Sequence, residues 1–244
     1  MTTLNLNSTL ANWVIQYPRT ATVFEALGLN YCCEGDETLE QACREQHLDP
    51  QQVVVKIEQI IAEHEDDSVT HWEDASLTQL CDHLEQTHHV FVKDELSRLS
   101  AMISEVVELH HFKHPEMQEL QASFTAMSDG IRPHTLKEEQ VLFPFIRDLE
   151  QNQSTCPLFV GYVDDVVKTM TRVHKHTGEW LSKIRKLTNN YQPPEDAGML
   201  YRITLDGLQT FERDLHLHVH KETHLLFPRA IEVEQQRVNA SRHH

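Results

Sequence analysis

The chain has 244 residues, in which 38 Asp and Glu outnumber 21 Lys and Arg, so its formal net charge is −17 with neutral histidines. This length can bury a substantial core and supply two domains. An acidic surface without a basic stripe repels phosphate groups, so we expect neither nucleic acid nor an anionic membrane as a partner. No apolar run approaches the length of a membrane span, and the first residues do not resemble a secretory signal.

The numbers of cysteines and histidines bear on the cellular compartment and on the kind of functional site. Five cysteines form no even disulfide framework, which suits a reducing compartment, and we expect a cytoplasmic protein. Eighteen histidines are the unusual feature of the composition. Most of them stand among polar residues, so only their positions can identify functional ones.

Residues 1–63 are expected to form a small helical domain. One helix runs from Pro18 to Leu27 and is closed by Gly28. Thr38 begins a second helix as the N-cap of a capping box. The third helix begins at Asp49, which is followed by a proline and then by an apolar stripe.

Residues 64–76 are acidic, polar and weakly periodic, and we interpret them as the linker between two domains. Four long helical patterns follow in residues 77–235, with apolar residues at alternating three- and four-residue steps, and residues 236–244 form a tail. Turn signals separate the patterns near His114-Pro115, Asn152–Pro157 and Asn189–Pro194. The sequence therefore predicts an all-α protein with an up-down four-helix bundle after a small helical domain.

A repeated motif lies on this predicted bundle. His-x-x-Lys-Glu-x-x-(Val/Leu)-Leu-Phe-Pro occurs at 134–144 and again at 218–228. In each copy a histidine and a glutamate are four residues apart, so both leave the same helix face, and that face is the apolar one. A carboxylate buried there without a partner costs several kcal/mol, which a multivalent cation would offset.

The other two helical patterns each add one histidine to the expected site. His89 and His174 precede the motif histidines by 45 and 44 residues and fall in the same layer of an up-down bundle. The predicted metal ligands are His89, His134, Glu138, His174, His218 and Glu222. His88 is the alternative to His89, because it continues the same stripe, whereas His176 faces elsewhere than His174. We place the remaining helix histidines on the surface or behind the ligands: His83, His111, His114, His216, His220 and His224.

Four imidazoles and two carboxylates exceed the needs of a single ion. Two ions, each with two histidines and sharing both glutamates as bridges, fit the number of ligands. Imidazole with carboxylate suits iron, and also manganese or zinc. Two carboxylates leave positive charge that an oxide or hydroxide bridge would balance, and such a site has room for oxygen or nitric oxide. The alternatives are a buried polar network without metal and a zinc site without chemistry.

The bundle with its paired His-x-x-x-Glu motifs resembles the hemerythrin-like proteins. Residues 29–35, Leu-Asn-Tyr-Cys-Cys-Glu-Gly, followed by Thr38-Leu39, narrow this resemblance. They are similar to the Tyr-Cys-Cys-Gly-Gly-x-x-Thr-Leu element of the repair-of-iron-centres di-iron proteins. The resemblance covers nearly the whole chain and implies two non-haem iron ions, with the family's four histidines and two bridging glutamates on the six positions given above. It also implies a role in repairing iron–sulfur clusters damaged by nitrosative or oxidative stress, with the damaged iron–sulfur proteins as partners.

The cysteine pair admits two readings. Cys32 and Cys33 are either redox or iron-transfer thiols or a small apolar pair, and Glu34, where the family usually has glycine, changes their surroundings. The other cysteines, Cys43, Cys81 and Cys156, have no ligand spacing and are expected to be inert.

Three functions fit the predicted centre: delivery of iron to damaged clusters, binding or sensing of oxygen or nitric oxide, and reduction of nitric oxide or peroxide. The cysteine element favours delivery, because a carrier of oxygen needs only the bundle. Whether the protein is an enzyme stays open, as do the client protein, the electron donor and the redox state of the centre. A homodimer through the N-terminal domain is compatible with the sequence.

Overall fold

The structure is a computed structural model that describes residues 4–63, 72–151 and 162–241. Within these residues every regular element is a helix, apart from one isolated bridge between Thr9 and Thr38. The all-α prediction is therefore confirmed. Residues 64–71 of the predicted linker, the predicted turn at Asn152–Pro157, and Cys156 lie outside the described residues.

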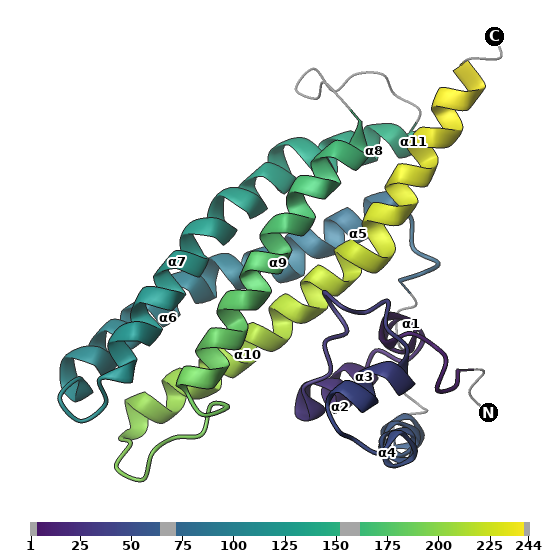
Figure 1. Cartoon of the computed structure of the whole chain (residues 1–244). Coiled ribbons are helices and arrows are strands. Elements are labelled where there is room, and N and C mark those ends of the chain that lie inside the picture. Colours follow the sequence, from purple (N-terminus) through teal and green to yellow (C-terminus); the bar gives the residue numbers. More distant parts are fainter. Residues whose placement is uncertain (1–3, 64–71, 152–161, 242–244) are drawn as a thin grey trace. The chain divides into compact units, whose positions relative to one another are not determined.

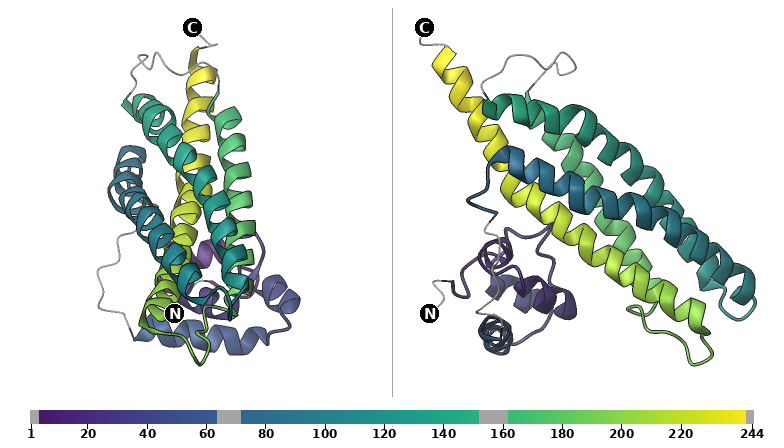
Figure 2. Two further views of the ribbon diagram at one scale, coloured as in Figure 1. Left: turned by 90° about the vertical axis from the view of Figure 1, so that its left-hand side faces the viewer. Right: turned by 180° about the vertical axis from the view of Figure 1, so that it is seen from behind.

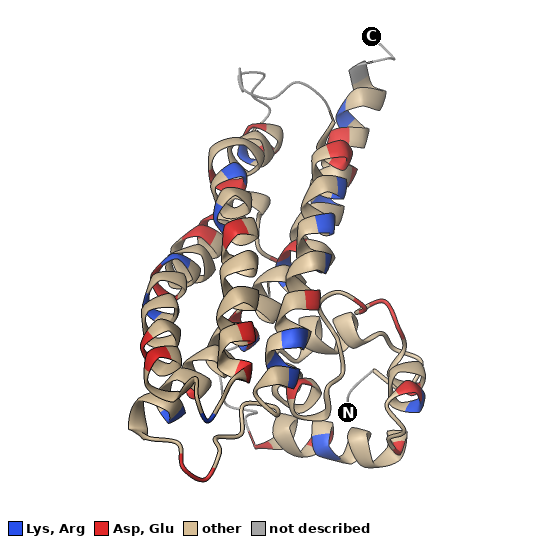
Figure 3. Cartoon of the chain, turned by 60° about the vertical axis from the view of Figure 1, so that its left-hand side comes forward, with Lys and Arg blue, Asp and Glu red and all other residues tan. Residues whose placement is uncertain are grey.

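The chain divides into two compact units (Figures 1 and 2). The first comprises Met1–Ser76 together with the helical segment His216–Arg229. The second comprises Leu77–Leu215 and Ala230–His244. In both units, acidic and basic positions are interspersed along the helices (Figure 3).

The first unit contains four short helices near the N-terminus. They are α1 (Leu10–Gln16), α2 (Thr20–Leu27), α3 (Leu39–Glu45) and α4 (Pro50–Ala62). The predicted capping box at Thr38 is present, Asp49 caps α4, and Gly28 ends α2 with a left-handed φ of 70°. Helix α1, which Thr9 caps, was not predicted. The apolar core of this unit includes Trp13, Phe24, Tyr31, Leu39, Ile57 and Val219.

In the described residues after position 71, seven further helices and three π-helical turns build four long rods. The α-helices are α5 (Leu77–His83), α6 (Val90–His110), α7 (Glu116–Lys137), α8 (Phe143–Gln151), α9 (Val163–Leu187), α10 (Met199–Lys221) and α11 (Phe227–Ser241). The π turns are η1 (Leu84–His89), η2 (Glu138–Leu142) and η3 (Glu222–Leu226). The rods are α5-η1-α6, α7-η2-α8, α9 and α10-η3-α11, in agreement with the predicted four-helix bundle.

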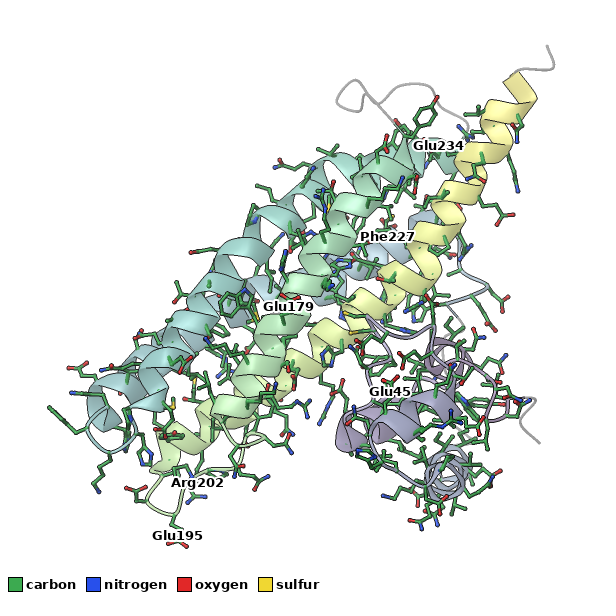
Figure 4. All side chains as sticks on the ribbon, viewed as in Figure 1. Glu45, Glu179, Glu195, Arg202, Phe227 and Glu234 are labelled. Carbon is green, nitrogen blue, oxygen red and sulfur yellow. The ribbon has the colours of Figure 1, made fainter. Side chains whose placement is uncertain are left out.

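Apolar packing and carboxylate caps hold the rods of the second unit. Leu99, Ile103 and Phe124 belong to one buried core, and the ring centroids of Phe124 and Phe211 are 5.9 Å apart. Glu234, labelled in Figure 4, accepts the Val163 N–H at the start of α9 at 3.0 Å. Glu150 does the same for Leu77 and Thr78 at the start of α5, at 2.8 and 2.9 Å. A carboxylate at a helix N-terminus satisfies N–H groups that have no partner in the helix and complements the helix dipole.

The predicted turn after α9 is confirmed. Asn189, Asn190 and Tyr191 have φ values of 47°, 58° and 60°, which end the helix in the left-handed region. Asn tolerates this region better than most residues, and the Thr188 hydroxyl accepts the Tyr191 N–H at 3.2 Å. Within the described residues, none of the helices has both the length and the apolar character that a bilayer span requires.

The sequence did not predict the π turns. Two of them immediately precede the Phe-Pro steps at Phe143-Pro144 and Phe227-Pro228. A proline within a helix lacks one N–H and crowds the carbonyl four residues earlier, and a wider preceding turn accommodates both effects. The interruptions η2 and η3 therefore have a local cause in the repeated motif itself, whereas η1 has no proline after it.

The ring of His114 lies between two carboxylates and makes the stability of the α6–α7 turn depend on pH. Its Nε2 is 3.0 Å from Asp196 and its Nδ1 is 3.1 Å from Glu116. Desolvation lowers the pKa of His114, but the hydrogen bonds to Asp196 and Glu116 outweigh it, so the pKa is raised overall. A raised folded-state pKa contributes stability below the unfolded value of about 6.5 and loses it as pH rises through the folded pKa.

We therefore expect His114→Gln to lower the melting temperature at about pH 5.5 and to have little effect at about pH 8.5, measured by thermal unfolding across that range. His176→Gln is the control, because His176 pairs with Glu179 on an exposed helix surface and should change little at any pH. A His114→Gln effect that is the same at both pH values would contradict this account.

Candidate metal centre

The structure brings all six predicted ligands together in two groups. One group consists of His89, Glu138, His218 and Glu222, and the other of His134, Glu138, His174 and Glu222. In each group the ligand atoms lie within 4.8 Å of one another. Both glutamates belong to both groups, which is the arrangement expected of a site for two cations.

The side chains of both groups are buried, and this burial makes the charges of the two glutamates costly. Glu138 and Glu222 are both 0% exposed, and each of the four histidines is buried. Neither carboxylate oxygen of Glu138 accepts a hydrogen bond from the described residues that satisfies ordinary geometry. Burying a charged carboxylate without a hydrogen bond costs folding free energy, and a cation held among the ligand atoms of each group would offset that cost.

The distances between donor atoms suit this interpretation. Nε2 of His134 lies 3.1 Å from Oε1 of Glu138 and 3.1 Å from Nε2 of His174. Nε2 of His218 lies 3.0 Å from Oε1 of Glu222. Imidazole nitrogens and carboxylate oxygens converging in this way fit iron, manganese or zinc.

The π turns lie at the predicted ligands. Glu138 is the first residue of η2, Glu222 the first of η3, and His89 the last of η1. Such turns occur often at functional sites. His174 comes from α9, the rod without a π turn among the described residues.

The choice that the sequence left open between His88 and His89, and the one it made for His174 over His176, both have a geometric counterpart. His89 belongs to a ligand group, whereas Nδ1 of the adjacent His88 lies 2.9 Å from Oδ1 of Asp214. His174 belongs to a group, whereas His176 lies 3.1 Å from the exposed Glu179, labelled in Figure 4.

The two adjacent cysteines form a thiol pair with unequal members. Their sulfurs are 3.2 Å apart, with Cys32 buried and Cys33 exposed. The hydrogen bond from Cys32 lowers the pKa of Cys33, burial opposes this, and the nearby His216 lowers it further. The same hydrogen bond, together with burial, raises the pKa of Cys32. Glu34, the departure from the family pattern, accepts a hydrogen bond from Asn30 at 3.1 Å.

Three histidines that the sequence did not single out hold this cysteine element. His220 donates to the Tyr31 carbonyl at 3.3 Å, and His224 donates to the Cys32 carbonyl at 3.2 Å. The ring of His216 meets that of Tyr31 edge-on, with centroids 6.1 Å apart. His220 is buried rather than on the surface, and burial lowers its pKa to about 3. The four-residue spacing of these histidines was the available signal, because it puts them on one helix face, away from His218 and Glu222.

A four-helix bundle with two buried His/Glu groups that share both glutamates defines a hemerythrin-like cation-binding protein. Comparison with known families agrees, since the model for the hemerythrin HHE cation binding domain matches residues 82–230. A second model, ScdA_N, described as a domain of unknown function (DUF542), matches residues 6–61.

Similar proteins extend over nearly the whole chain. The iron-sulfur cluster repair protein ScdA of Staphylococcus haemolyticus is 27% identical over 90% of this chain and 96% of its own length. The iron-sulfur cluster repair protein YtfE of Musicola paradisiaca is 31% identical over 92% of this chain and 96% of its own. YtfE of Yersinia pestis is 31% identical over 93% and 98%. The chain belongs to the ScdA/YtfE family of iron-sulfur cluster repair proteins, which confirms the resemblance inferred from the sequence.

Glu138→Gln tests whether the buried carboxylates serve a cation. In the metal-free protein we expect this variant to be at least as stable as the wild type, because it removes a buried charge. Divalent metal should raise the melting temperature of the wild type and raise that of the variant much less, since binding to the folded state alone adds stability. Thermal unfolding with and without metal measures both effects, and an equal metal-induced rise would contradict the role of Glu138.

Proposed function

We propose that this protein holds two iron ions and supplies iron to iron–sulfur proteins whose clusters have been damaged by nitrosative or oxidative stress. The observation that carries the proposal is the pair of buried groups sharing Glu138 and Glu222, in a chain whose relatives over 90% or more of its length are iron-sulfur cluster repair proteins. In this proposal His89 and His218 hold one ion, His134 and His174 hold the other, and the glutamates bridge them.

Iron is the metal that fits both the donor atoms of the site and the names of the relatives. Imidazole with carboxylate binds several divalent metals, and the relatives' names refer to iron. When bound, iron supplies redox chemistry and a store that ligand exchange can release. The burial of all six side chains keeps water from the carboxylates and limits loss of iron to solvent.

Cys33 is the side chain that we propose receives iron for transfer. It is exposed, its pKa is lowered by the hydrogen bond from Cys32, and thiolate is the form that binds metal. His220 and His224, which bond the cysteine element, lie on the helical segment that also carries His218 and Glu222. Hydrogen bonds therefore connect the backbone beside the thiol pair to the helical segment that carries the proposed ligands His218 and Glu222.

We extend the proposal to the domain organisation of the chain, its protein partners and its cellular location. Residues 1–63 form the domain that presents the thiols, residues 64–76 the linker, and residues 77–235 the metal-binding bundle. The partners are damaged iron–sulfur proteins, and the place of action is the cytoplasm.

Reconstitution of an iron–sulfur enzyme tests delivery. With inorganic sulfide present, iron-loaded protein should restore activity to a cluster-depleted enzyme as its own iron content falls. Cys33→Ser should keep the full iron load yet slow restoration by about an order of magnitude, because a hydroxyl is a poor metal ligand at neutral pH. Cys43→Ala is the control, since Cys43 is a buried cysteine of the same unit and should leave restoration unchanged.

The same samples separate the competing functions. Reversible oxygen binding without loss of iron would support a carrier, and sustained consumption of nitric oxide with an electron donor would support an enzyme. Either result, without restoration of the client, would contradict delivery.

Gly35→Ala tests the tie between the cysteine element and the helix. A Cβ at Gly35 would lie 2.6 Å from Nε2 of His224 and would also meet the Tyr31 carbonyl, so the element must shift. We expect unchanged iron content and slower restoration of the client enzyme. Gly130→Ala is the control, because a Cβ there meets nothing within 4 Å. Equal restoration rates for the two variants would show that the tie is unimportant for transfer.

A further inference from the structure

We propose that Glu139 is the positioning residue that makes His89, and not the adjacent His88, a metal ligand; this inference rests on the proposed metal centre. Glu139 directly follows the bridging Glu138 in η2, whereas the two histidines end η1 on another rod. On a helix, consecutive side chains point in different directions, so only one of two adjacent histidines can face a given site.

Glu139 contacts the Nδ1 side of the His89 ring. Its Oε1 lies 3.0 Å from Nδ1 of His89. Nζ of Lys93, one turn after His89, donates to the same carboxylate at 2.5 and 2.7 Å. The carboxylate is therefore held by two side chains of the neighbouring rod.

This hydrogen bond determines which ring nitrogen is free to bind a metal. With the proton of His89 on Nδ1 and donated to Glu139, the lone pair is on Nε2. That Nε2 lies 3.6 Å from Oε2 of Glu138, the carboxylate common to both ligand groups. A carboxylate behind a metal-binding imidazole fixes its tautomer and orientation and increases its basicity.

Phe143 holds the face of the same ring. The His89 and Phe143 rings are stacked, with centroids 5.4 Å apart and planes inclined by 21°. Both Phe143 and Glu139 lie in the first copy of the repeated motif. This copy thus supplies two ligands of its own and orients a third on another rod.

His88 is held by a different acid. Its Nδ1 lies 2.9 Å from Oδ1 of Asp214 in α10, and its ring meets that of His83 edge-on at 5.3 Å. The two adjacent histidines therefore contact carboxylates that belong to two different rods.

Anaerobic titration of the metal-free full-length protein with ferrous ion, against a competing chelator, tests this assignment. Wild type should bind two ions per chain. Glu139→Ala should weaken the binding of one ion about 10–100-fold, the usual effect of removing a carboxylate behind a ligand. Glu139→Gln should recover much of this affinity, because its amide oxygen can still accept the Nδ1 proton.

Three matched variants distinguish positioning from simple packing. Lys93→Met removes the ion pair between the rods but leaves the hydrogen bond between Glu139 and His89, so it should bind both ions nearly as wild type does. Asp214→Ala and His88→Ala should likewise keep both ions. Circular dichroism of each apo variant verifies that the helices are formed.

Three results would overturn the inference. One is a Glu139→Ala variant that binds both ions as tightly as wild type. Another is a Lys93→Met variant that loses as much affinity as Glu139→Ala, because the carboxylate would then act only as a link between rods. The third is a His88→Ala variant that loses an ion. A wild type that binds no iron would instead refute the metal centre itself, a different result from all three.

Discussion

Two carboxylates turned into the interior of a helical bundle impose the main constraint on this protein. Glu138 and Glu222 are fully buried, and both belong to each of the two groups that also contain the buried histidines. The desolvation penalty is several kcal/mol per ion, whereas a folded domain is stable by only about 5–15 kcal/mol in total. Cation binding and folding are therefore linked, because each ion that enters relieves a cost that the fold otherwise carries. In the proposed delivery of iron, loss of the metal would return that cost to the bundle.

Much of the fold was predictable because its causes are local. The capping box at Thr38 and the glycine at position 28 determine helix ends through their own backbones, and both predictions are confirmed. The long apolar stripes predicted the rods, and the four-residue spacing in each motif copy predicted which side chains share a face. The structure brings the residues chosen in this way into the two groups, although their role as ligands stays a prediction.

The remaining features depend on contacts between segments distant in the sequence. The choice between His88 and His89, which the repeat spacing only favoured, involves contacts with Asp214 and Glu139 from other rods, and the residues next to the two histidines do not reveal these contacts. The burial of His220 depends on a carbonyl 189 residues earlier. The π turns escaped prediction for another reason. The inserted residue moves the buried face by one position, so Leu142 and Ile146 are buried after Glu138, whereas Val141 and Phe145 are only partly buried. Because apolar residues stand at both sets of positions, the sequence pattern fits either register.

The two copies of the motif have the same predicted ligands but different surroundings, and this difference bears on the proposed function. In the first copy, Glu139 and Phe143 surround His89, whereas the second copy has Thr223 in place of Glu139. In the second copy, His220 and His224 bond the cysteine element, whereas the matching positions of the first copy are Leu136, which is 48% exposed, and Gln140. One copy is thus specialised to orient a further ligand and the other to hold the thiols. In the proposed centre, which is symmetric in its predicted ligands, the first copy would then serve retention of the metal and the second its transfer.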